Sequence, residues 1–285
     1  MGKKIIARSQ ASCGEFIQGI IGGKELIVSC PIDMYSYACV EVDGPIYPLA
    51  KKAKEAAVRT LDFIGEKKEV LDRLSIQVHS DIPVGKGMGS STADIAAVCT
   101  AVAAVFGVQL ESTELSHIAV SIEPTDSTIF DKITLFDSRN GTVIEPLGKA
   151  PDMYVIVLEG RDRLDTIEFH KIKKHSGHPL DEAYRLLRSG IEKGSVEDVA
   201  SASTMSALNN QRILPKPYID FILDSAIARG AAGITVAHTG TSIGVLVDGR
   251  KGDMERIEDF FVHSHITDYY KVYGRKIINS KPEVV

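Results

Sequence analysis

Apolar and polar positions follow two different periodicities along the first half of the chain, one typical of strands and one typical of helices. The pattern predicts that strands and helices alternate there. Alternating or β-branched runs predict strands at residues 4–8, 35–42 and 74–78. The stretch 49–64 repeats apolar residues at helical spacing and stops at Gly65. Residues 91–106 are almost wholly apolar and stop at Gly107, so this helix is expected to be buried on all sides.

A helix followed by a hairpin is expected near the end of this half. The helix is predicted at residues 111–121. Strand-like residues at 133–136 and 142–144 then flank Asn140-Gly141, a pair that suits a tight type I′ turn.

A second unit is expected to begin near Pro151. Its predicted elements are a strand at 154–158, helices at 180–191 and 218–229, strands at 233–237 and 242–247, a helix at 253–262 and a strand at 270–277. This order is close to a split βαβ sandwich with one extra helix. We therefore expect two domains, residues 1–150 and 151–285.

Composition narrows the class of protein. With 44% hydrophobic residues among 285, the chain has enough apolar content to exclude a disordered protein. The formal net charge of −5 and the lack of a long basic run argue against a nucleic-acid partner. No apolar run approaches the roughly 18 residues of a membrane span, so no membrane association is expected.

The remaining signals favour a cytoplasmic location. The first residues lack the apolar core and cleavage site of a signal peptide. The four cysteines have no metal-binding spacing and are expected to be reduced thiols: Cys13, Cys30, Cys39 and Cys99. Five histidines lie in polar stretches and are expected at the surface: His170, His175, His178, His263 and His265.

A glycine-rich segment before the buried helix carries the sharpest chemical signal. It reads Pro83-Val84-Gly85-Lys86-Gly87-Met88-Gly89-Ser90-Ser91-Thr92-Ala93. Glycines let backbone N–H groups approach phosphate oxygens, and a helix N-terminus adds unpaired N–H groups and a positive dipole end. The three hydroxyl residues before Ala93 could cap the helix or reach a metal-bound phosphate. The absence of a Gly-Lys-Ser/Thr triplet excludes a Walker A motif. A purely structural turn is the alternative.

Two carboxylates three residues apart form a second candidate site. Glu123-Pro124-Thr125-Asp126-Ser127 follows the helix predicted at 111–121. Magnesium prefers a few hard oxygen ligands together with phosphate and water, so these acids suit a site next to a phosphate loop. An ordinary Asp-Ser turn with a solvated glutamate is the alternative.

Three motifs in the chain resemble those of the GHMP small-molecule kinases. The segment Pro-x3-Gly-Met-Gly-Ser-Ser-Thr-Ala from Pro83 is similar to the family motif that wraps ATP phosphates. The segment around Gly14 and Glu15 lies where the family has its substrate-side motif. The segment that contains His238, Gly240 and Thr241 lies where a glycine-rich turn backs the phosphate loop.

The spelling of these motifs narrows the resemblance to one branch. Ser-Cys-Gly-Glu, Glu-Pro-Thr-Asp-Ser and Ala-His-x-Gly-Thr are similar to the branch that makes L-threonine O-3-phosphate for cobalamin biosynthesis. Two departures concern the general family pattern. Gln10-Ala11-Ser12 replaces a Pro-Gly-Arg opening, and the third motif has fewer glycines than usual.

The resemblance implies a fold and a reaction. The fold would be α+β, a GHMP kinase two-domain fold with a ribosomal S5 domain 2-like N-terminal domain and a ferredoxin-like C-terminal domain. The reaction would be direct transfer of the γ-phosphoryl group of ATP to the side-chain hydroxyl of L-threonine. Homoserine or another amino acid or alcohol remains an alternative acceptor, and a non-catalytic nucleotide sensor is the alternative from another class. Whether the chain forms a homodimer is left open.

The resemblance also assigns residues to roles. Ser91 and Glu123 would hold Mg²⁺ on the phosphates, and Asp126 would accept or orient the proton of the substrate alcohol. Lys86 is considered on chemical grounds: an ammonium in a phosphate loop would stabilise the charge that spreads during transfer, so a phosphate contact is one expectation and a solvated loop lysine is the alternative. Glu15 would face the substrate ammonium or act as a buried structural cap.

The third motif is assigned a supporting role. His238 is expected to hold its turn by hydrogen bonding, next to Gly240 and Thr241. Gly14 is expected to support Glu15 in the first motif.

Overall fold

The computed structural model describes residues 3–161 and 178–285, so the predictions for His170 and His175 fall outside the described residues. In that part of the chain, ten strands form one sheet in the order β5-β4-β2-β1-β7-β8-β6-β9, with β3 beside β2 and β10 beside β1. The strands are β1 (Lys4–Ile21), β2 (Lys24–Val42), β3 (Leu74–Ser80), β4 (Ile133–Phe136), β5 (Ile144–Gly148), β6 (Met153–Gly160), β7 (Gly233–Val236), β8 (Ile243–Asp248), β9 (Tyr270–Lys276) and β10 (Glu283–Val284). The α-helices are α1 (Lys51–Phe63), α2 (Ser90–Val105), α3 (Ser112–Val120), α5 (Asp181–Lys193), α6 (Val196–Asn210), α7 (Ile219–Ile227) and α8 (Met254–Val262).

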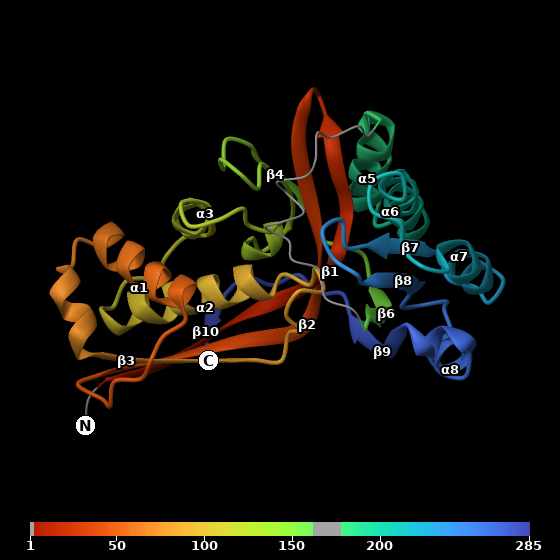
Figure 1. Ribbon diagram of the computed structural model, residues 1–285. Helices are drawn as coiled ribbons and strands as arrows, with labels where there is room; N and C mark the ends of the chain where they lie inside the picture. The colour runs from red at the N-terminus through yellow and green to blue at the C-terminus, as the bar shows by residue number, and fades with distance from the viewer. Residues whose placement is uncertain (1–2, 162–177) are drawn as a thin grey trace.

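The hairpin of β1 and β2 connects the two halves of the molecule. Its register shifts between Ser12 and Glu15 and again between Glu15 and Ile17, so the strands bulge there. Figure 1 shows the far end of this hairpin (red) standing upright from its first part, beside α5 and α6. The sequence predicted only the two outer parts of these strands. Glycines and small residues interrupt the alternation elsewhere and hide the rest of β1.

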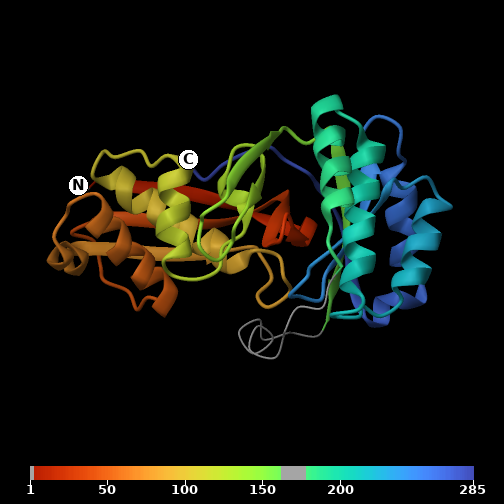
Figure 2. The same ribbon diagram turned by 90° about the horizontal axis from the view of Figure 1, so that it is seen from above.

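Helices α1, α2 and α3 cover one face of the first half of the sheet (Figures 1 and 2). Helix α2 is buried along most of its surface, with side chains from Ile95 to Val105 in the core cluster around it. The apolar content of this helix therefore correctly predicted a central position. Helix α1 ends at Phe63, and Gly65 follows with a φ of +78°, which confirms the predicted stop.

The second half has the strand order of a split βαβ unit. Strands β9, β6, β8 and β7 lie side by side and are antiparallel, which is the order 4-1-3-2 in this half. Among the described residues between β6 and β7 there are three helices, where the sequence predicted two. Helix α6 was missed because its buried side includes small and polar residues such as Ser203 and Ser206. Ser195, whose hydroxyl accepts from Asp198 N at 3.2 Å, is the capping signal that would have located it.

The predicted tight turn at Asn140-Gly141 is wrong. Phe136 pairs with Ile144, so seven residues connect the strands and no two-residue type I′ turn forms. The buried Asp137 carboxylate organises this loop by accepting from four groups: Arg139 N at 3.1 Å, Asn140 N at 3.1 Å, Asn140 Nδ2 at 3.4 Å and the Thr142 hydroxyl at 2.6 Å. Burial opposes ionisation of Asp137, but these hydrogen bonds lower its pKa.

The two halves share one hydrophobic core. Phe16 and Ile21 at the far end of the hairpin pack in the same cluster as Leu180 and Leu187. The end of the chain also returns to the first half, where Val284 pairs with Ala7. The four cysteines are free. Among the helices of the described residues, none combines the length and apolar character needed to cross a membrane.

Candidate active site

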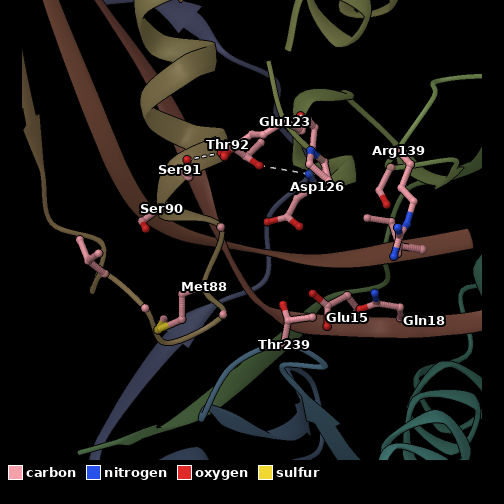
Figure 3. Close-up of a pocket in the computed structure, with 18 of the residues that line it drawn as sticks. Glu15, Gln18, Met88, Ser90, Ser91, Thr92, Glu123, Asp126, Arg139 and Thr239 are labelled. Carbon is pink, nitrogen blue, oxygen red and sulfur yellow. Dashed lines mark hydrogen bonds between the residues drawn. The ribbon is translucent and has the colours of Figure 1, made fainter. Parts of the chain in front are cut away.

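A cavity of about 590 Å³ lies where the start of α2 meets the hairpin of β1 and β2. Figure 3 shows this cavity with most of the side chains that line it. Its lining residues come from both halves: Glu15, Gln18, Glu25, Ile27, Lys52, Val84, Gly85, Gly87, Met88, Gly89, Ser90, Ser91, Thr92, Glu123, Pro124, Thr125, Asp126, Ser138, Arg139 and Thr239. The structure therefore brings together the phosphate loop, both predicted acids and Glu15.

The glycine-rich loop is fixed by backbone hydrogen bonds on both sides. Ser12 N donates to Met88 O at 3.0 Å, and the Met88 side chain is buried. On the other side, Thr241 N donates to Lys86 O at 3.1 Å. A Cβ at Gly240 would lie 2.1 Å from Lys86 O, so only glycine permits this close approach. The third motif thus lies directly against the loop, as the sequence suggested.

The loop ends by turning into α2. Gly89 has a φ of +71° and precedes the first helical residue, so the helix begins at Ser90 and is not capped by a serine side chain. The expectation of a serine cap is therefore wrong. The first turn still presents the N–H groups of Ser90, Ser91 and Thr92 without intrahelical acceptors, beside the cavity.

The hydroxyl groups at the helix start bind the two acids. The Ser91 hydroxyl donates to Glu123 Oε1. Lys52 Nζ donates to the Ser91 hydroxyl at 2.9 Å and lies 2.5 Å from Glu123 Oε2. The Thr92 hydroxyl accepts from Asp126 N at 3.1 Å (Figure 3). Two hard oxygen donors, Ser91 and Glu123, thus lie together next to the glycine-rich loop. The positively charged ammonium of Lys52 contacts both of them.

Asp126 lies at the centre of the cavity. A Cβ at Gly89 would be 2.6 Å from Asp126 Oδ2, so the carboxylate rests directly on the end of the loop. Burial, followed by the negative charges of Glu15 and Glu123, raises the pKa of Asp126 to about 7. A carboxylate with this pKa is matched to accept a proton near neutral pH.

Glu15 is held by the third motif. Its Oε2 accepts from His238 N at 3.0 Å and lies 3.0 Å from His238 Nδ1. His238 Nε2 lies 3.3 Å from the Ser206 hydroxyl on α6. Gly14 has a φ of +63° and lies against Val236, which places Glu15 beside this turn. These contacts fit a supporting role for His238, while Glu15 still lines the cavity.

Lys86 does not line the cavity. Its ammonium donates to Gly160 O at 2.5 Å and to Arg161 O at 2.8 Å, and the residue is only 5% exposed. The prediction of a phosphate contact therefore disagrees with this placement, as does the alternative of a solvated lysine. A buried ammonium is stabilised by carbonyl oxygens, and those at the end of β6 supply them.

Sequence reasoning missed several lining residues. Lys52 lies near the start of the helix predicted at 49–64, and Arg139 directly precedes the predicted turn at Asn140-Gly141, so neither carried a chemical signal. Gln18 and Glu25 lie near the far end of the hairpin, which the sequence did not predict. Thr239 lies inside the third motif, where its motif position was the available signal.

Comparison with known proteins agrees with this geometry. The sequence profile of the GHMP kinases N terminal domain matches residues 49–134, and that of the GHMP kinases C terminal domain matches residues 187–263. An L-threonine kinase of Citrobacter freundii is 34% identical over 93% of this chain and 94% of its own length. An L-threonine kinase of Salmonella typhimurium strain LT2 is also 34% identical, over 93% and 90%.

A solved structure shows the same fold. Homoserine kinase from Cytophaga hutchinsonii superposes with a TM-score of 0.69 over 100% of this chain and 97% of its own, at 17% identity. This likeness supports the predicted α+β kinase fold.

Proposed function

This chain belongs to the GHMP kinases, and we propose that it phosphorylates the side-chain hydroxyl of L-threonine to give L-threonine O-3-phosphate. The observation that carries the proposal is the cavity in which Asp126 lies beside the phosphate loop and Glu15. The 34% identity to two L-threonine kinases supports threonine as the acceptor.

The phosphate end of the cavity would bind ATP. The N–H groups at the start of α2 and the glycine loop would receive the phosphate oxygens. Ser91 and Glu123 would hold Mg²⁺, since their oxygens are hard donors that already lie together. When bound, Mg²⁺ would neutralise charge on the transferred phosphoryl group. Lys52 would then add a positive charge beside the same oxygens.

Asp126 would act on the acceptor. Its carboxylate lies against Gly89 at the end of the loop, so an alcohol bound next to it would face the phosphates. Asp126 would accept the hydroxyl proton as the oxygen attacks the γ-phosphorus and the bond to the leaving ADP oxygen breaks. Alignment and electrostatic stabilisation would supply most of the acceleration.

Glu15 would face the substrate ammonium. One of its oxygens is engaged by His238, which fixes the carboxylate at the wall of the cavity. A fixed, buried carboxylate is a strong partner for an ammonium group. The turn that holds it also carries Thr239, so the two motifs would form one wall of the acceptor site.

An assay of ADP release with several acceptors tests the proposal. L-threonine, L-homoserine, L-serine and ethanolamine would be compared in parallel with Mg-ATP, and ³¹P NMR would identify the phosphorylated product. We expect L-threonine to give the highest kcat/KM. Serine lacks one methyl group, which corresponds to a preference of roughly 10–200-fold. A higher kcat/KM with homoserine would refute the assignment of the acceptor.

We also propose a cytoplasmic role in supply of the threonine phosphate used for the cobalamin linker. The motif spellings described above support this role. Loss of the gene should then make cobalamin synthesis depend on added L-threonine O-3-phosphate, and growth without such dependence would contradict it. Light scattering would decide between a monomer and a homodimer.

A further inference from the structure

The acceptor end of the cavity carries a positive side chain to which the reaction described above gives no role. Among the described residues that line the cavity, the cationic side chains are Lys52 and Arg139. Lys52 is bound at the phosphate end by Ser91 and Glu123. Arg139 lies on the other side of Asp126 in Figure 3, away from the loop.

The backbone of Arg139 is tied to the loop that carries Asp126. Arg139 N donates to the buried Asp137 carboxylate at 3.1 Å, which fixes the conformation of the connection between β4 and β5. Thr125 N donates to Ser138 O at 2.9 Å, one residue before each of the two side chains in question. This hydrogen bond fixes the backbone of Arg139 relative to the backbone of Asp126.

The guanidinium is positioned to bind an anion in the cavity. Its Nη2 lies 3.4 Å from Glu25 Oε2, and the Arg139 side chain remains 43% exposed. A guanidinium has five N–H donors in a planar fork that matches the two oxygens of a carboxylate. This ion pair with Glu25 holds the guanidinium at the cavity wall.

The proposed acceptor has a carboxylate close to its reacting hydroxyl. In L-threonine, the carbon that bears the hydroxyl is bonded to the carbon that bears both charged groups. With the substrate hydroxyl at Asp126 and its ammonium at Glu15, the α-carboxylate of the substrate still needs a positively charged partner. Arg139 lies on the side of the cavity where that partner is required. Resting on the threonine kinase function proposed above, we propose that Arg139 binds the α-carboxylate of the substrate and selects a free amino acid over its carboxyl-neutral analogues.

Substrate pairs test this role. L-threonine and L-threonine amide share the hydroxyl and ammonium groups but differ in the charge of the carboxyl group. The wild type should prefer L-threonine by about 100-fold in kcat/KM. Arg139→Ala should lower kcat/KM for L-threonine by about 100-fold, mainly through KM, and change the amide value by less than about threefold. Arg139→Lys keeps the positive charge but lacks the planar fork of donors. Its kcat/KM for L-threonine should lie between the values of the wild type and of Arg139→Ala.

Controls separate recognition from a structural effect. Arg188 makes a similar exposed ion pair, 3.3 Å from Glu145, and does not line the cavity. Arg188→Ala should therefore leave kcat/KM unchanged for both L-threonine and its amide. Equal losses on threonine and on its amide in Arg139→Ala, or no loss on either, would overturn the proposal. If the wild type instead phosphorylates another hydroxy acid, the threonine assignment fails, and that acid with its amide still tests Arg139.

Discussion

The two ends of the cavity are built in different ways. The end at which we propose that phosphates bind is formed mainly by one continuous segment, the glycine-rich loop and the start of α2. The acceptor end is formed by side chains from distant parts of the chain, among them Glu15, Asp126 and Arg139. A phosphate is bound by any correctly shaped backbone, whereas one particular amino acid requires charges at specific positions.

This difference predicts where substitutions act. Substitutions at the acceptor end should alter kcat or the preference among acceptors, and should change the KM for ATP little. Changes at the phosphate end should alter the use of Mg-ATP for every acceptor. The following substitutions test that separation, in order of expected effect.

Asp126→Asn should have the largest effect. The amide keeps the shape of the side chain but cannot accept the proton, so kcat should fall by roughly 10²–10⁴-fold. The KM for ATP should stay within about threefold of the wild type. Steady-state ADP release measures both values, and a kcat near that of the wild type would show that Asp126 is not the base.

Ser91→Ala and Glu123→Gln should impair the phosphate end. Each removes one of the paired oxygen donors, so kcat/KM for Mg-ATP should fall by about 100-fold with every acceptor tested. A titration of Mg²⁺ at fixed ATP should show half-saturation at higher concentration. Ser121→Ala removes an exposed hydroxyl that bonds only its own helix, at Ile118 O, and serves as the control. An unchanged Mg²⁺ titration would argue against the metal site.

Gly89→Ala should displace Asp126, because Gly89 lies where the two ends of the cavity meet. The new Cβ would be 2.6 Å from Asp126 Oδ2 in addition to the backbone strain of a φ of +71°. We expect roughly a 10–100-fold loss of kcat because Asp126 must shift. Gly107→Ala is a matched control, since Gly107 has a φ of +80° but no atom within 4 Å of its Cβ position. Equal activity of the two variants would contradict the placement of Asp126.

Lys86→Met should affect stability more than catalysis. The variant leaves the carbonyl oxygens of Gly160 and Arg161 without this ammonium, which should lower the free energy of unfolding by about 1–3 kcal/mol. The KM for ATP should stay within about threefold. Thermal denaturation and ADP release measure these quantities. A large rise of the KM for ATP with an unchanged Tm would instead support the contact between Lys86 and a phosphate that the sequence suggested.

The raised pKa of Asp126 should appear in the pH dependence. Because the reaction requires the ionised carboxylate, kcat/KM should rise with pH and level off above about pH 7. The folded state also binds this proton more tightly than the unfolded state, whose aspartate pKa is about 3.9. The contribution of Asp126 to stability is therefore fully present below about pH 4 and is lost as the pH rises through about 7.

A substitution isolates this last effect. Asp126→Asn removes the buried charge, so it should stabilise the protein by roughly 1–3 kcal/mol at pH 8 and by less at pH 5. Denaturant unfolding at the two pH values measures the difference. Asp72→Asn, at an exposed position, should show no such trend. Equal stabilisation by Asp126→Asn at both pH values would count against a charge penalty at this site.

The sequence predicted the continuous parts of the molecule well. The buried helix α2, the stop at Gly65 and the glycine-rich loop before α2 each depend on neighbouring residues, so their pattern is visible in the order of the chain. The long strand β1 and helix α6 were harder, because bulges and small buried residues remove the expected periodicity. Helix α6 matters for the site, since its Ser206 contacts the histidine that holds Glu15.

The order of residues alone located the glycine-rich loop and the pair of acids, because each lies within a short segment, and the resemblance of these motifs to a known family indicated the class of fold. Only the tertiary structure decided that Lys86 binds carbonyl groups, that Lys52 joins Ser91 and Glu123, and that Arg139 lines the same cavity as Asp126. A long side chain can reach in several directions, and its partner is chosen by the segments that packing brings beside it. No local pattern records that choice.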